Sequence, residues 1–551
     1  MLALLMVVGA IILFVIAFNT YGTYLSRSWG LDDTTPTPAH VKEDGVDFVP
    51  APAPVLLGHH FSSIAGAGPI NGPIIAATFG WVPVLLWIII GGIFFGGVHD
   101  FGSLTASIKH EGKSIGTIVE DYMGPTGKTL FSAFAWLTLV LVVAAFTSIV
   151  ASTFAKAPEA ASASILFMIE AVIFGYAVYR KGAKLGPATV IGVIVLFASI
   201  YVGTLIPITL SATTWTIILA VYIFIASTAP VWILLQPRDY LNSFLLYAMM
   251  IGAVLGVIIA RPEINFEAYS GFKLVKANGS VQFLFPTLFI TVACGAISGF
   301  HSLVGSGTTS KQIDKEKDAK LIGYGGMLIE CALAVVALIT AAYLTKEGYA
   351  DTMANGGPTV VFANGVADFM NKFGIPVQAG YNFVILSISA FALTSLDTAT
   401  RLARFIFQEF FEKNHGEGKQ SPLTNMWVST TITVVCGAAL ALKGYQLIWP
   451  IFGSANQLLA ALALLGVATW LKCTGKKFGM LVVPIIFMFA ATLTALIIET
   501  KNYFVAAQTN GGVGNYIMTV LPIVLFILAI ILAVLGIKTL SSKDDRITSR
   551  N

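Results

Sequence analysis

Long apolar stretches separated by short polar ones run through the whole chain of 551 residues. A helix needs about 20 mostly apolar residues to cross the hydrocarbon core of a bilayer. Segments of this kind lie near residues 3–24, 58–80, 82–107, 130–153, 162–179, 187–208, 214–235, 243–260, 284–310, 321–345, 376–400, 425–442, 447–471, 479–498 and 515–537. The pattern predicts an all-α polytopic membrane protein with about fifteen transmembrane helices, forming one membrane domain over residues 1–551.

Composition supports this class and excludes an ordinary soluble protein. Hydrophobic residues make up 56% of the chain and charged residues only 11%, whereas soluble domains carry about 25% charged residues. The first apolar segment lacks a basic start and a small-residue cleavage site, so we interpret it as a retained helix. The four cysteines show no disulfide or metal spacing and are interpreted as packing residues.

Basic residues gather in alternate loops. Cytoplasmic loops of membrane proteins are enriched in Lys and Arg, and about three quarters of the 32 basic residues lie on one side of the predicted bundle. That side includes the loop 25–57 and the C-terminal tail. We therefore expect 25–57 to be cytoplasmic, the N-terminus to lie outside and the C-terminus to lie in the cytoplasm.

Two short stretches repeat one another. FSSIAGAGPI at 61–70 and FHSLVGSGTT at 300–309 share the form F-x-S-[IL]-[AV]-G-[AS]-G. The predicted spans place them on helices that run in opposite directions, which is typical of an inverted-topology repeat. We expect the first repeat to begin near residue 58 and the second near residue 284.

The repeated stretches are unfavourable for a continuous helix. Gly lowers helix stability by about 1 kcal/mol relative to Ala and Pro by about 3 kcal/mol, and Pro69 and Pro73 each remove a backbone donor. We therefore expect the first helix to break within residues 66–73. Freed backbone groups inside a membrane must face protein or a water-filled cavity, where half-helix N-termini favour an anion and carbonyls favour a cation.

Polar side chains beside both stretches favour a binding site over the alternative of a close-packing glycine motif. These side chains would supply hydrogen-bonding groups at the breaks. The predicted substrate-binding residues are Ser62, Ser63, Gly66, Gly68, Asn71, His301, Ser302, Gly305, Ser306, Gly307 and Thr308.

Ionisable residues inside predicted spans suggest functional sites because they are costly to bury. We predict that His99, Asp100 or Asp397 carries a coupling proton. Adjacent side chains on a helix diverge by about 100°, so His99 and Asp100 need not pair. Asp397 can form an i,i+4 ion pair with Arg401, either structural or as a gate.

Other polar residues in the spans give weaker signals. Glu170 and Glu330 are equally compatible with structural and functional roles. His59 and His60 are two adjacent candidate metal ligands. They lack two further well-spaced ligands, so no metal site is predicted and a metal on this pair stays an open alternative. The stretch WPIFGSANQ at 449–457 combines a predicted helix interruption with amide dipoles, and either lines a pathway or caps a loop.

No nucleotide-binding or catalytic motif is present in the sequence. The chain therefore has no visible means of using ATP, and a secondary transporter driven by an ion gradient is favoured over an enzyme. We expect no cofactor apart from the coupling ion, which we expect to be a proton, although small polar groups and carbonyls suit sodium equally.

Six ordered motifs then resemble one family. They are GHHFSSIAGAGPINGPIIAATFGWVP at 58–83, GGVHDFGSL at 96–104, LLQPRDYLN at 234–242, GFHSLVGSGTTSKQI at 299–313, TSLDTATRLARF at 394–405 and WPIFGSANQLLA at 449–460. Together they resemble the carbon starvation protein A family of bacterial inner-membrane permeases. The resemblance implies peptide uptake or proton-coupled pyruvate uptake during nutrient limitation, and a fold like that of amino acid–polyamine–organocation transporters with two broken helices. Such a core has five-plus-five helices, whereas the spacing here also allows a seven-plus-seven arrangement.

The combined prediction is a proton-coupled importer of a small nutrient in the bacterial inner membrane, with a pyruvate-like monocarboxylate ahead of short peptides. A substrate carboxylate would lie against half-helix N-termini at residues 66–68 or 305–307. The expected partners are this small molecule and membrane lipid, without nucleic acid. A nutrient-sensing receptor or channel is the alternative, and an intramembrane enzyme built on His59/His60 or His99/Asp100 is a third class.

Overall fold

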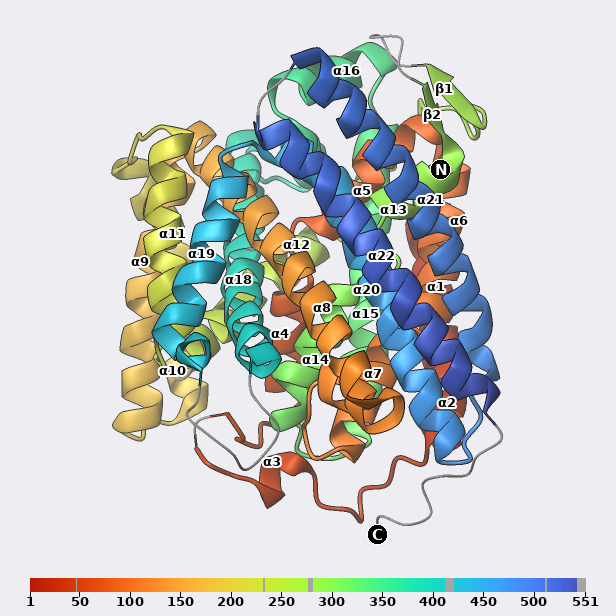
Figure 1. Cartoon of the computed structure of the whole chain (residues 1–551). Coiled ribbons are helices and arrows are strands. Elements are labelled where there is room, and N and C mark those ends of the chain that lie inside the picture. Colours follow the sequence, from red (N-terminus) through yellow and green to blue (C-terminus); the bar gives the residue numbers. More distant parts are fainter. Residues whose placement is uncertain (46, 231–232, 276–280, 412–420, 511–512, 543–551) are drawn as a thin grey trace.

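The computed structural model describes residues 1–551 except 46, 231–232, 276–280, 412–420, 511–512 and 543–551. Almost all of the regular structure in this part is helical, apart from the antiparallel hairpin of β1 (Lys273–Val275) and β2 (Val281–Phe283), in which Lys273 pairs with Phe283. The helices pack side by side into one bundle (Figure 1). The predicted all-α polytopic class is confirmed.

Eleven stretches of the described chain are long and apolar enough to cross a membrane. They contain α1 (Leu2–Asn19) with α2 (Tyr21–Trp29), α6 (Trp81–Gly91) with α7 (Gly97–Lys109), α8 (Ile115–Lys156), α9 (Pro158–Gly175), α10 (Leu185–Leu205), α12 (Leu235–Ala260), α15 (Gly326–Ala342), α18 (Val377–Phe411), α20 (Tyr445–Cys473), α21 (Gly479–Asn510) and α22 (Val513–Ser541). Two shorter apolar helices are α11 (Ala212–Thr228) and α19 (Met426–Ala441).

Two further apolar segments are interrupted. One consists of α4 (Ala53–Ile64) and α5 (Gly68–Ala76), and the other of α13 (Leu284–Thr291) and α14 (Gly299–Gly307). The remaining α-helices are short or lie between spans: α3 (Pro38–Val41), α16 (Lys346–Asn355) and α17 (Pro358–Asn371). The lengths of these helices do not define where the membrane begins and ends. The count of fifteen spans therefore stays a prediction.

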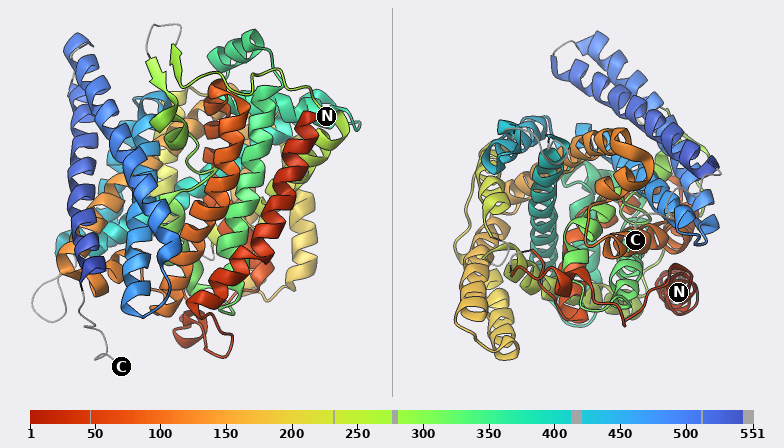
Figure 2. Two further views of the ribbon diagram at one scale, coloured as in Figure 1. Left: turned by 90° about the vertical axis from the view of Figure 1, so that its right-hand side faces the viewer. Right: turned by 60° about the horizontal axis from the view of Figure 1, so that its bottom comes forward.

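The interrupted segments run in opposite directions through the bundle. α4 lies towards the lower end of Figure 1 and α5 above it, whereas α13 lies above α14. This direction is compatible with an inverted repeat, which itself stays a prediction. α1 begins at the upper end and α22 ends at the lower end (Figure 2).

Two predicted boundaries were wrong. Residues 236–242, which lie between the segments predicted at 214–235 and 243–260, belong to α12, which begins at Leu235 and buries Arg238 and Asp239. The loop predicted at 25–57 is shorter, since α2 extends to Trp29 and α4 begins at Ala53. Arg238 and Asp239 continue a helix because they find partners inside the protein, whereas the apolar residues 53–57 lengthen α4.

Local sequence explains the shape of the longest helix. The Ser114 hydroxyl caps α8 by accepting a hydrogen bond from the backbone N–H of Thr117, at 3.3 Å. Gly124 has a φ of 82°, which interrupts the helical path directly before Pro125. Pro158 begins α9 immediately after α8 ends. The helix is therefore capped, kinked and ended by residues with the appropriate backbone preference.

Burial separates a central group of helices from a peripheral one. The apolar windows of α18 and α20 are 94% and 100% buried, whereas those of α10 and α22 are 22% and 28% buried. α21 and α22 stand at one side of the bundle (Figure 2). The exposed apolar faces of the peripheral helices suit contact with lipid, and the two broken segments lie among the buried elements.

Candidate transport site

The first helix break lies where two glycines allow side chains of other segments to come close to the backbone. α4 ends at Ile64 and α5 begins at Gly68, so the break precedes Pro73, which continues inside α5. A Cβ atom on Gly66 would lie 2.8 Å from the Ser395 hydroxyl oxygen, and one on Gly68 would lie 2.5 Å from the sulfur of Cys294. The break predicted within residues 66–73 is therefore present but starts slightly earlier.

The second break does not coincide with the repeated phrase. Residues 292–298 leave the helical path, and α14 then runs from Gly299 to Gly307. Gly305 and Gly307 accordingly lie in the last turns of α14 and not at a half-helix N-terminus. The prediction of an anion-binding N-terminus at 305–307 was wrong, because α14 continues through both glycines. A Cβ atom on Gly307 would lie 2.5 Å from Leu402, whereas one on Gly305 would meet nothing closer than 3.8 Å.

The stretch at 449–457 holds this second break together. α20 is continuous through Pro450, so the predicted interruption was wrong. The Asn456 carboxamide oxygen accepts a hydrogen bond from the Phe300 backbone N–H at 2.8 Å, and its nitrogen donates to the Ser298 hydroxyl at 3.0 Å. The Gln457 carboxamide donates to the carbonyl oxygen of Phe289 at 2.5 Å. Backbone groups freed by the break are thus satisfied by side chains of α20.

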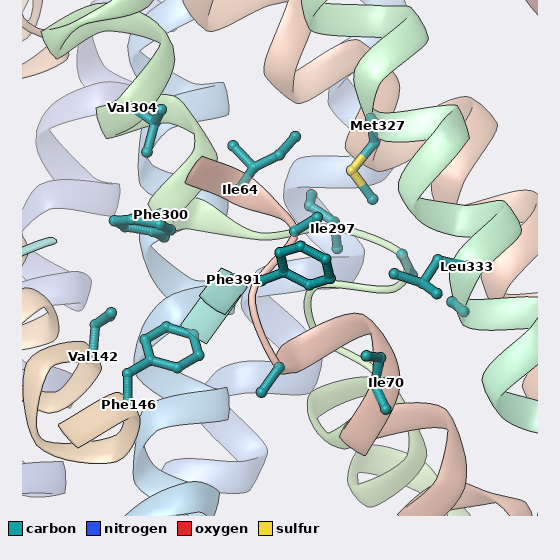
Figure 3. Packing of buried hydrophobic residues seen from close by; sticks show 14 of the residues in the cluster. Ile64, Ile70, Val142, Phe146, Ile297, Phe300, Val304, Met327, Leu333 and Phe391 are labelled. Carbon is teal, nitrogen blue, oxygen red and sulfur yellow. The ribbon is translucent and has the colours of Figure 1, made fainter. Parts of the chain in front are cut away.

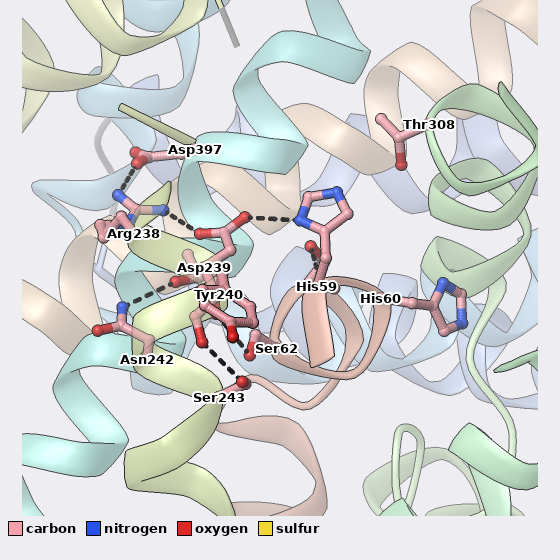
Figure 4. A network of polar contacts seen from close by, with 12 residues as sticks. His59, His60, Ser62, Arg238, Asp239, Tyr240, Asn242, Ser243, Thr308 and Asp397 are labelled. Atoms are coloured by element: carbon pink, nitrogen blue, oxygen red, sulfur yellow. Dashed lines mark hydrogen bonds and ion pairs between the residues drawn. The ribbon is translucent and has the colours of Figure 1, made fainter. Parts of the chain in front are cut away.

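Beside the first break lies a buried group that we name the arginine network, formed by His59, Tyr222, Arg238, Asp239 and Asp397 (Figure 4). The Arg238 guanidinium donates to Asp397 and, at 2.9 Å, to Asp239. The Tyr222 hydroxyl donates to Asp397 at 2.6 Å. These side chains come from α4, α11, α12 and α18, so the network ties the broken helix to three others.

The arginine network carries an unbalanced set of charges. One guanidinium faces the two carboxylates Asp239 and Asp397, and both carboxylates are fully buried. His59 Nδ1 lies 3.3 Å from Asp239 Oδ2, yet neither atom has a hydrogen-bond partner in the described structure. An uncompensated buried charge is costly, so uptake of one proton by this network would balance it.

Asp397 does not form the predicted pair with Arg401. The Arg401 guanidinium instead donates to the backbone carbonyls of Ala226 and Ala229, and Arg404 donates to that of Ser227 at 2.8 Å. These carbonyls lie at the C-terminal end of α11, where a cation is favoured by the helix dipole. The i,i+4 interpretation failed because Asp397 faces Arg238 on another helix.

A second buried group, the histidine network, contains His99, Asp100, Cys294, His301 and Glu330. Although adjacent in sequence, His99 and Asp100 do pair, with 2.7 Å between His99 Nδ1 and Asp100 Oδ1. His301 Nδ1 lies 2.9 Å from Asp100 Oδ2. His301 Nε2 lies 3.5 Å from Glu330 Oε2, so the network reaches from α7 through α14 to α15.

His59 and His60 do not converge on one site. His59 faces Asp239, whereas His60 Nδ1 lies 2.8 Å from the hydroxyl oxygen of Thr309. Figure 4 shows the two rings on different sides of α4. The weak hypothesis of a metal site on this pair therefore finds no geometric support. Glu170 is buried on α9, away from both networks, and both of its carboxylate oxygens lack a hydrogen-bond partner in the described structure.

Two narrow cavities approach the broken helices from opposite ends. The upper cavity, named for its place in Figure 1, has a volume of about 40 Å³ and is lined by residues that include Asn71, Lys156, Thr359 and Ile385. The lower cavity has a volume of about 30 Å³ and is lined by residues that include His59, Asp239, Thr308, Lys311, Thr398 and Arg401. Each volume has room for a few water molecules.

Apolar side chains fill the middle of the bundle around the first break. Figure 3 shows Ile64, Ile70 and Phe146 beside Phe391. Phe391 lies midway along α18 between Ile385 of the upper cavity and Thr398 of the lower one, which are about 20 Å apart along the helix at 1.5 Å per residue. This apolar cluster separates the two cavities.

The predicted substrate-binding hydroxyls mostly bond to their own helices. The Ser63, Ser302, Ser306 and Thr308 hydroxyls donate to backbone carbonyls three or four residues earlier. The Ser62 hydroxyl donates to the Asp239 carbonyl at 3.3 Å. Asn71 lines the upper cavity, whereas Gly307 and Thr308 line the lower one. The other predicted residues line neither cavity, and the binding role of the whole set stays a prediction.

Comparison with known proteins assigns this chain to a family. The model of the family described as "Carbon starvation protein CstA" matches residues 2–356 and 348–495. The chain belongs to the carbon starvation protein CstA family. The resemblance expected from the six motifs is thus confirmed.

Members of the CstA family with curated names match over almost the full chain. The peptide transporter CstA of Bacillus subtilis (strain 168) is 32% identical, covering 97% of this chain and 96% of the relative. The peptide transporter CstA of Campylobacter jejuni is 34% identical over 89% of this chain and 79% of the relative. The pyruvate/proton symporter BtsT of Escherichia coli (strain K12) is 32% identical over 93% of this chain and 85% of the relative.

Among solved structures, a variant of the Eremococcus coleocola manganese transporter is more distant from this CstA family chain. It superimposes with a TM-score of 0.48 at 12% sequence identity, covering 90% of this chain and 98% of that chain.

Some residues of this CstA family chain were missed at the sequence level. Arg238 and Asp239 occur in LLQPRDYLN, one of the family motifs, but their charges placed them in a predicted loop. Pro237, directly before the charged pair, is compatible with the first turn of a helix, but nothing local in the sequence shows that the pair is buried. Cys294 and Tyr222 carry no local signal either, because their partners lie on helices remote in sequence.

Proposed function

We propose that this protein is a secondary transporter that imports a small carboxylate-bearing nutrient together with a proton, with a pyruvate-like monocarboxylate ahead of short peptides. The names of its relatives include both peptide transporters and a pyruvate/proton symporter, which supports the class and leaves the substrate open. Its place is the bacterial inner membrane, with the N-terminus outside. In this proposal the protein is a carrier and not an enzyme.

The observation that carries the proposal is the charge imbalance of the arginine network. Arg238 compensates one of the two carboxylates, Asp239 and Asp397, and leaves a site for one proton on the His59–Asp239 pair. His59 and Asp239 also line the lower cavity, so the pair has a route to water. A proton bound here lowers the cost of the buried charge when the lower cavity is closed.

Cationic side chains support a carboxylate as the substrate group. Lys156 lines the upper cavity, and Lys311 and Arg401 line the lower one. A negatively charged nutrient is thus met by a positive charge without a carboxylate in the upper cavity, whereas Asp47 and Asp239 also line the lower one. The N-terminus of α5 at Gly68 lies against Cys294 and lines neither cavity, so the carboxylate position predicted at residues 66–68 stays a prediction.

The experiment is uptake into proteoliposomes of labelled pyruvate and a labelled dipeptide, with and without an inward proton gradient and without sodium. We expect pyruvate accumulation that collapses when an uncoupler is added. Dipeptide accumulation alone would move the substrate to peptides, and accumulation only after sodium is added would contradict the proton. Transport of neither compound would favour a sensor or channel.

Two variants of the arginine network test the coupling step. We expect Asp397→Asn and His59→Gln to abolish accumulation while leaving exchange of internal for external substrate, because exchange needs no net proton movement. Asp351→Asn is the control, since Asp351 is exposed on α16. A folded Asp397→Asn variant that accumulates substrate like the wild type would exclude Asp397 from coupling. The predicted role of His99 and Asp100 stays a prediction, to which Asp100→Asn in the same assay applies.

A further inference from the structure

Three side chains of the histidine network converge without satisfying one another. One ligand atom each from Cys294, His301 and Glu330 lies within 4.8 Å of the other two. The three residues are 4%, 1% and 0% exposed, respectively. His301 Nε2 and both Glu330 carboxylate oxygens have no hydrogen-bond partner in the described structure. Buried polar atoms of this kind are costly unless they bind something.

The spacing suits two ligands of one metal ion better than a hydrogen bond. His301 Nε2 and Glu330 Oε2 are 3.5 Å apart, beyond the usual range of about 2.7–3.2 Å for a hydrogen bond. Two nitrogen or oxygen ligands at about 2.0–2.1 Å from a tetrahedral zinc ion are about 3.4 Å apart. The observed separation therefore leaves room for an ion between the two side chains.

Asp100 sets the protonation and the orientation that His301 needs as a metal ligand. The Asp100 carboxylate can only accept, so the proton of His301 lies on Nδ1, which donates to Asp100 at 2.9 Å. The lone pair of Nε2 is then directed towards Glu330. Carboxylate–histidine–metal arrangements of this form are common around protein-bound zinc.

The sulfur of Cys294 donates to the Ser298 hydroxyl at 3.6 Å as a thiol, and after loss of this proton it is placed to act as a thiolate ligand. It lies against Gly68 at the N-terminal turn of α5, where the helix dipole favours a negative charge. The Asn456 carboxamide nitrogen also donates to this sulfur, at 3.8 Å. Binding of a metal would release the thiol proton to solvent.

We propose that Cys294, His301 and Glu330 form a binding site for a divalent transition-metal ion of the zinc type, with Asp100 as a positioning residue for His301. A thiolate, an imidazole and a carboxylate suit Zn²⁺ or Co²⁺, whereas Mg²⁺ and Ca²⁺ prefer oxygen ligands throughout. The three ligands come from the unwound segment 292–298, α14 and α15. A bound ion ties the second helix break to α15.

The test uses Co²⁺ as a spectroscopic probe on the purified full chain in lipid nanodiscs, without any substrate. We expect one Co²⁺ per chain, a sulfur-to-cobalt charge-transfer band, and displacement of Co²⁺ by Zn²⁺. The band should disappear in Cys294→Ser and persist in Cys331→Ser, whose sulfur is also buried but lies outside the group. Absence of the band in the wild type, or its persistence in Cys294→Ser, would overturn the site.

Further variants keep the test decisive if one protein folds poorly. A triple variant, Cys331→Ser with Cys436→Ser and Cys473→Ser, retains Cys294 as the sole cysteine and must keep the band. Glu330→Gln should weaken Co²⁺ binding, whereas Glu170→Gln, at another buried carboxylate, should not. Asp100→Asn should weaken binding by about 10- to 100-fold, as expected for a group that orients a ligand. Equal affinity of Glu330→Gln and the wild type would contradict the proposal.

A consequence for transport rests on the function proposed above and is tested separately. Because the ion holds the second break to α15, we expect saturating Zn²⁺ to stop uptake by the wild type and to spare Cys294→Ser. If uptake continues when the cobalt band is fully developed, the ion does not stop transport by holding the second break to α15. The metal site itself would still be supported by that band. Failure of the proposed transport function would leave the binding result unaffected.

Discussion

At the scale of single residues, the first helix break requires glycine at position 68. Its hypothetical Cβ atom would lie only 2.5 Å from the Cys294 sulfur, whereas a Cβ atom on Gly9 of α1 would meet nothing within 4 Å. We expect Gly68→Ala to lower the stability by about 1–3 kcal/mol through overpacking and to reduce transport strongly. The control Gly9→Ala should leave both nearly unchanged.

The measurement is the thermal unfolding midpoint in detergent together with uptake. A double variant with Cys294→Ala removes the atom that the new methyl group meets, and should recover part of the lost stability because the two sites are in contact. A Gly68→Ala variant as stable and active as the wild type would show that the two broken segments do not need this close approach.

The break at Gly66 and Gly68 could be predicted from the sequence because helix weakening by Gly and Pro is a local property. The arginine network could not, since its members lie on four helices and only the fold brings them together. The burial of Arg238 could not be predicted for a further reason. A charged residue near the end of an apolar segment is assigned to a loop unless its buried partner is known. His99 and Asp100 were recognised as unusual, but their connection to His301 and Glu330 depends on tertiary packing.

At the scale of elements, α20 is the support for the second break. Asn456 satisfies the Phe300 backbone N–H and the Ser298 hydroxyl, and helix caps of this kind contribute about 0.5–2 kcal/mol. The sequence suggested that WPIFGSANQ is a broken helix. In the structure its proline lies near the N-terminal end of α20, and its carboxamides stabilise a break in a different segment.

We predict that Asn456→Leu speeds backbone hydrogen exchange in residues 292–300 and lowers uptake, because the freed N–H and hydroxyl lose their partner. The control is Thr469→Val, a buried position on the same helix whose hydroxyl donates only within α20 in the described contacts. Hydrogen exchange followed by mass spectrometry provides the measurement. Unchanged exchange in 292–300 would show that Asn456 is not the support.

At the scale of the whole molecule, the two ends of the bundle differ in charge. The elements at the lower end of Figure 1 include α3 and the ends of α7, α14 and α20. Basic residues end or follow several of these helices in the sequence, among them Lys109, Lys311, Lys315, Lys317 and Lys476. Because cytoplasmic loops are enriched in Lys and Arg, we expect this end to face the cytoplasm. In that orientation the lower cavity, with His59 and Asp239, would lie on the side where an imported proton is released.

Labelling of introduced cysteines tests this orientation in right-side-out membrane vesicles. We expect a membrane-impermeant maleimide to react with Asp351→Cys on α16 in sealed vesicles, and with Glu43→Cys after α3 only when the vesicles are opened. Both positions are exposed, and they lie at opposite ends of the bundle. The background carries Ser at 436 and 473, while Cys294 and Cys331 are buried. The reverse pattern would invert the molecule, and the His59–Asp239 pair would then take up its proton from the outside through the lower cavity.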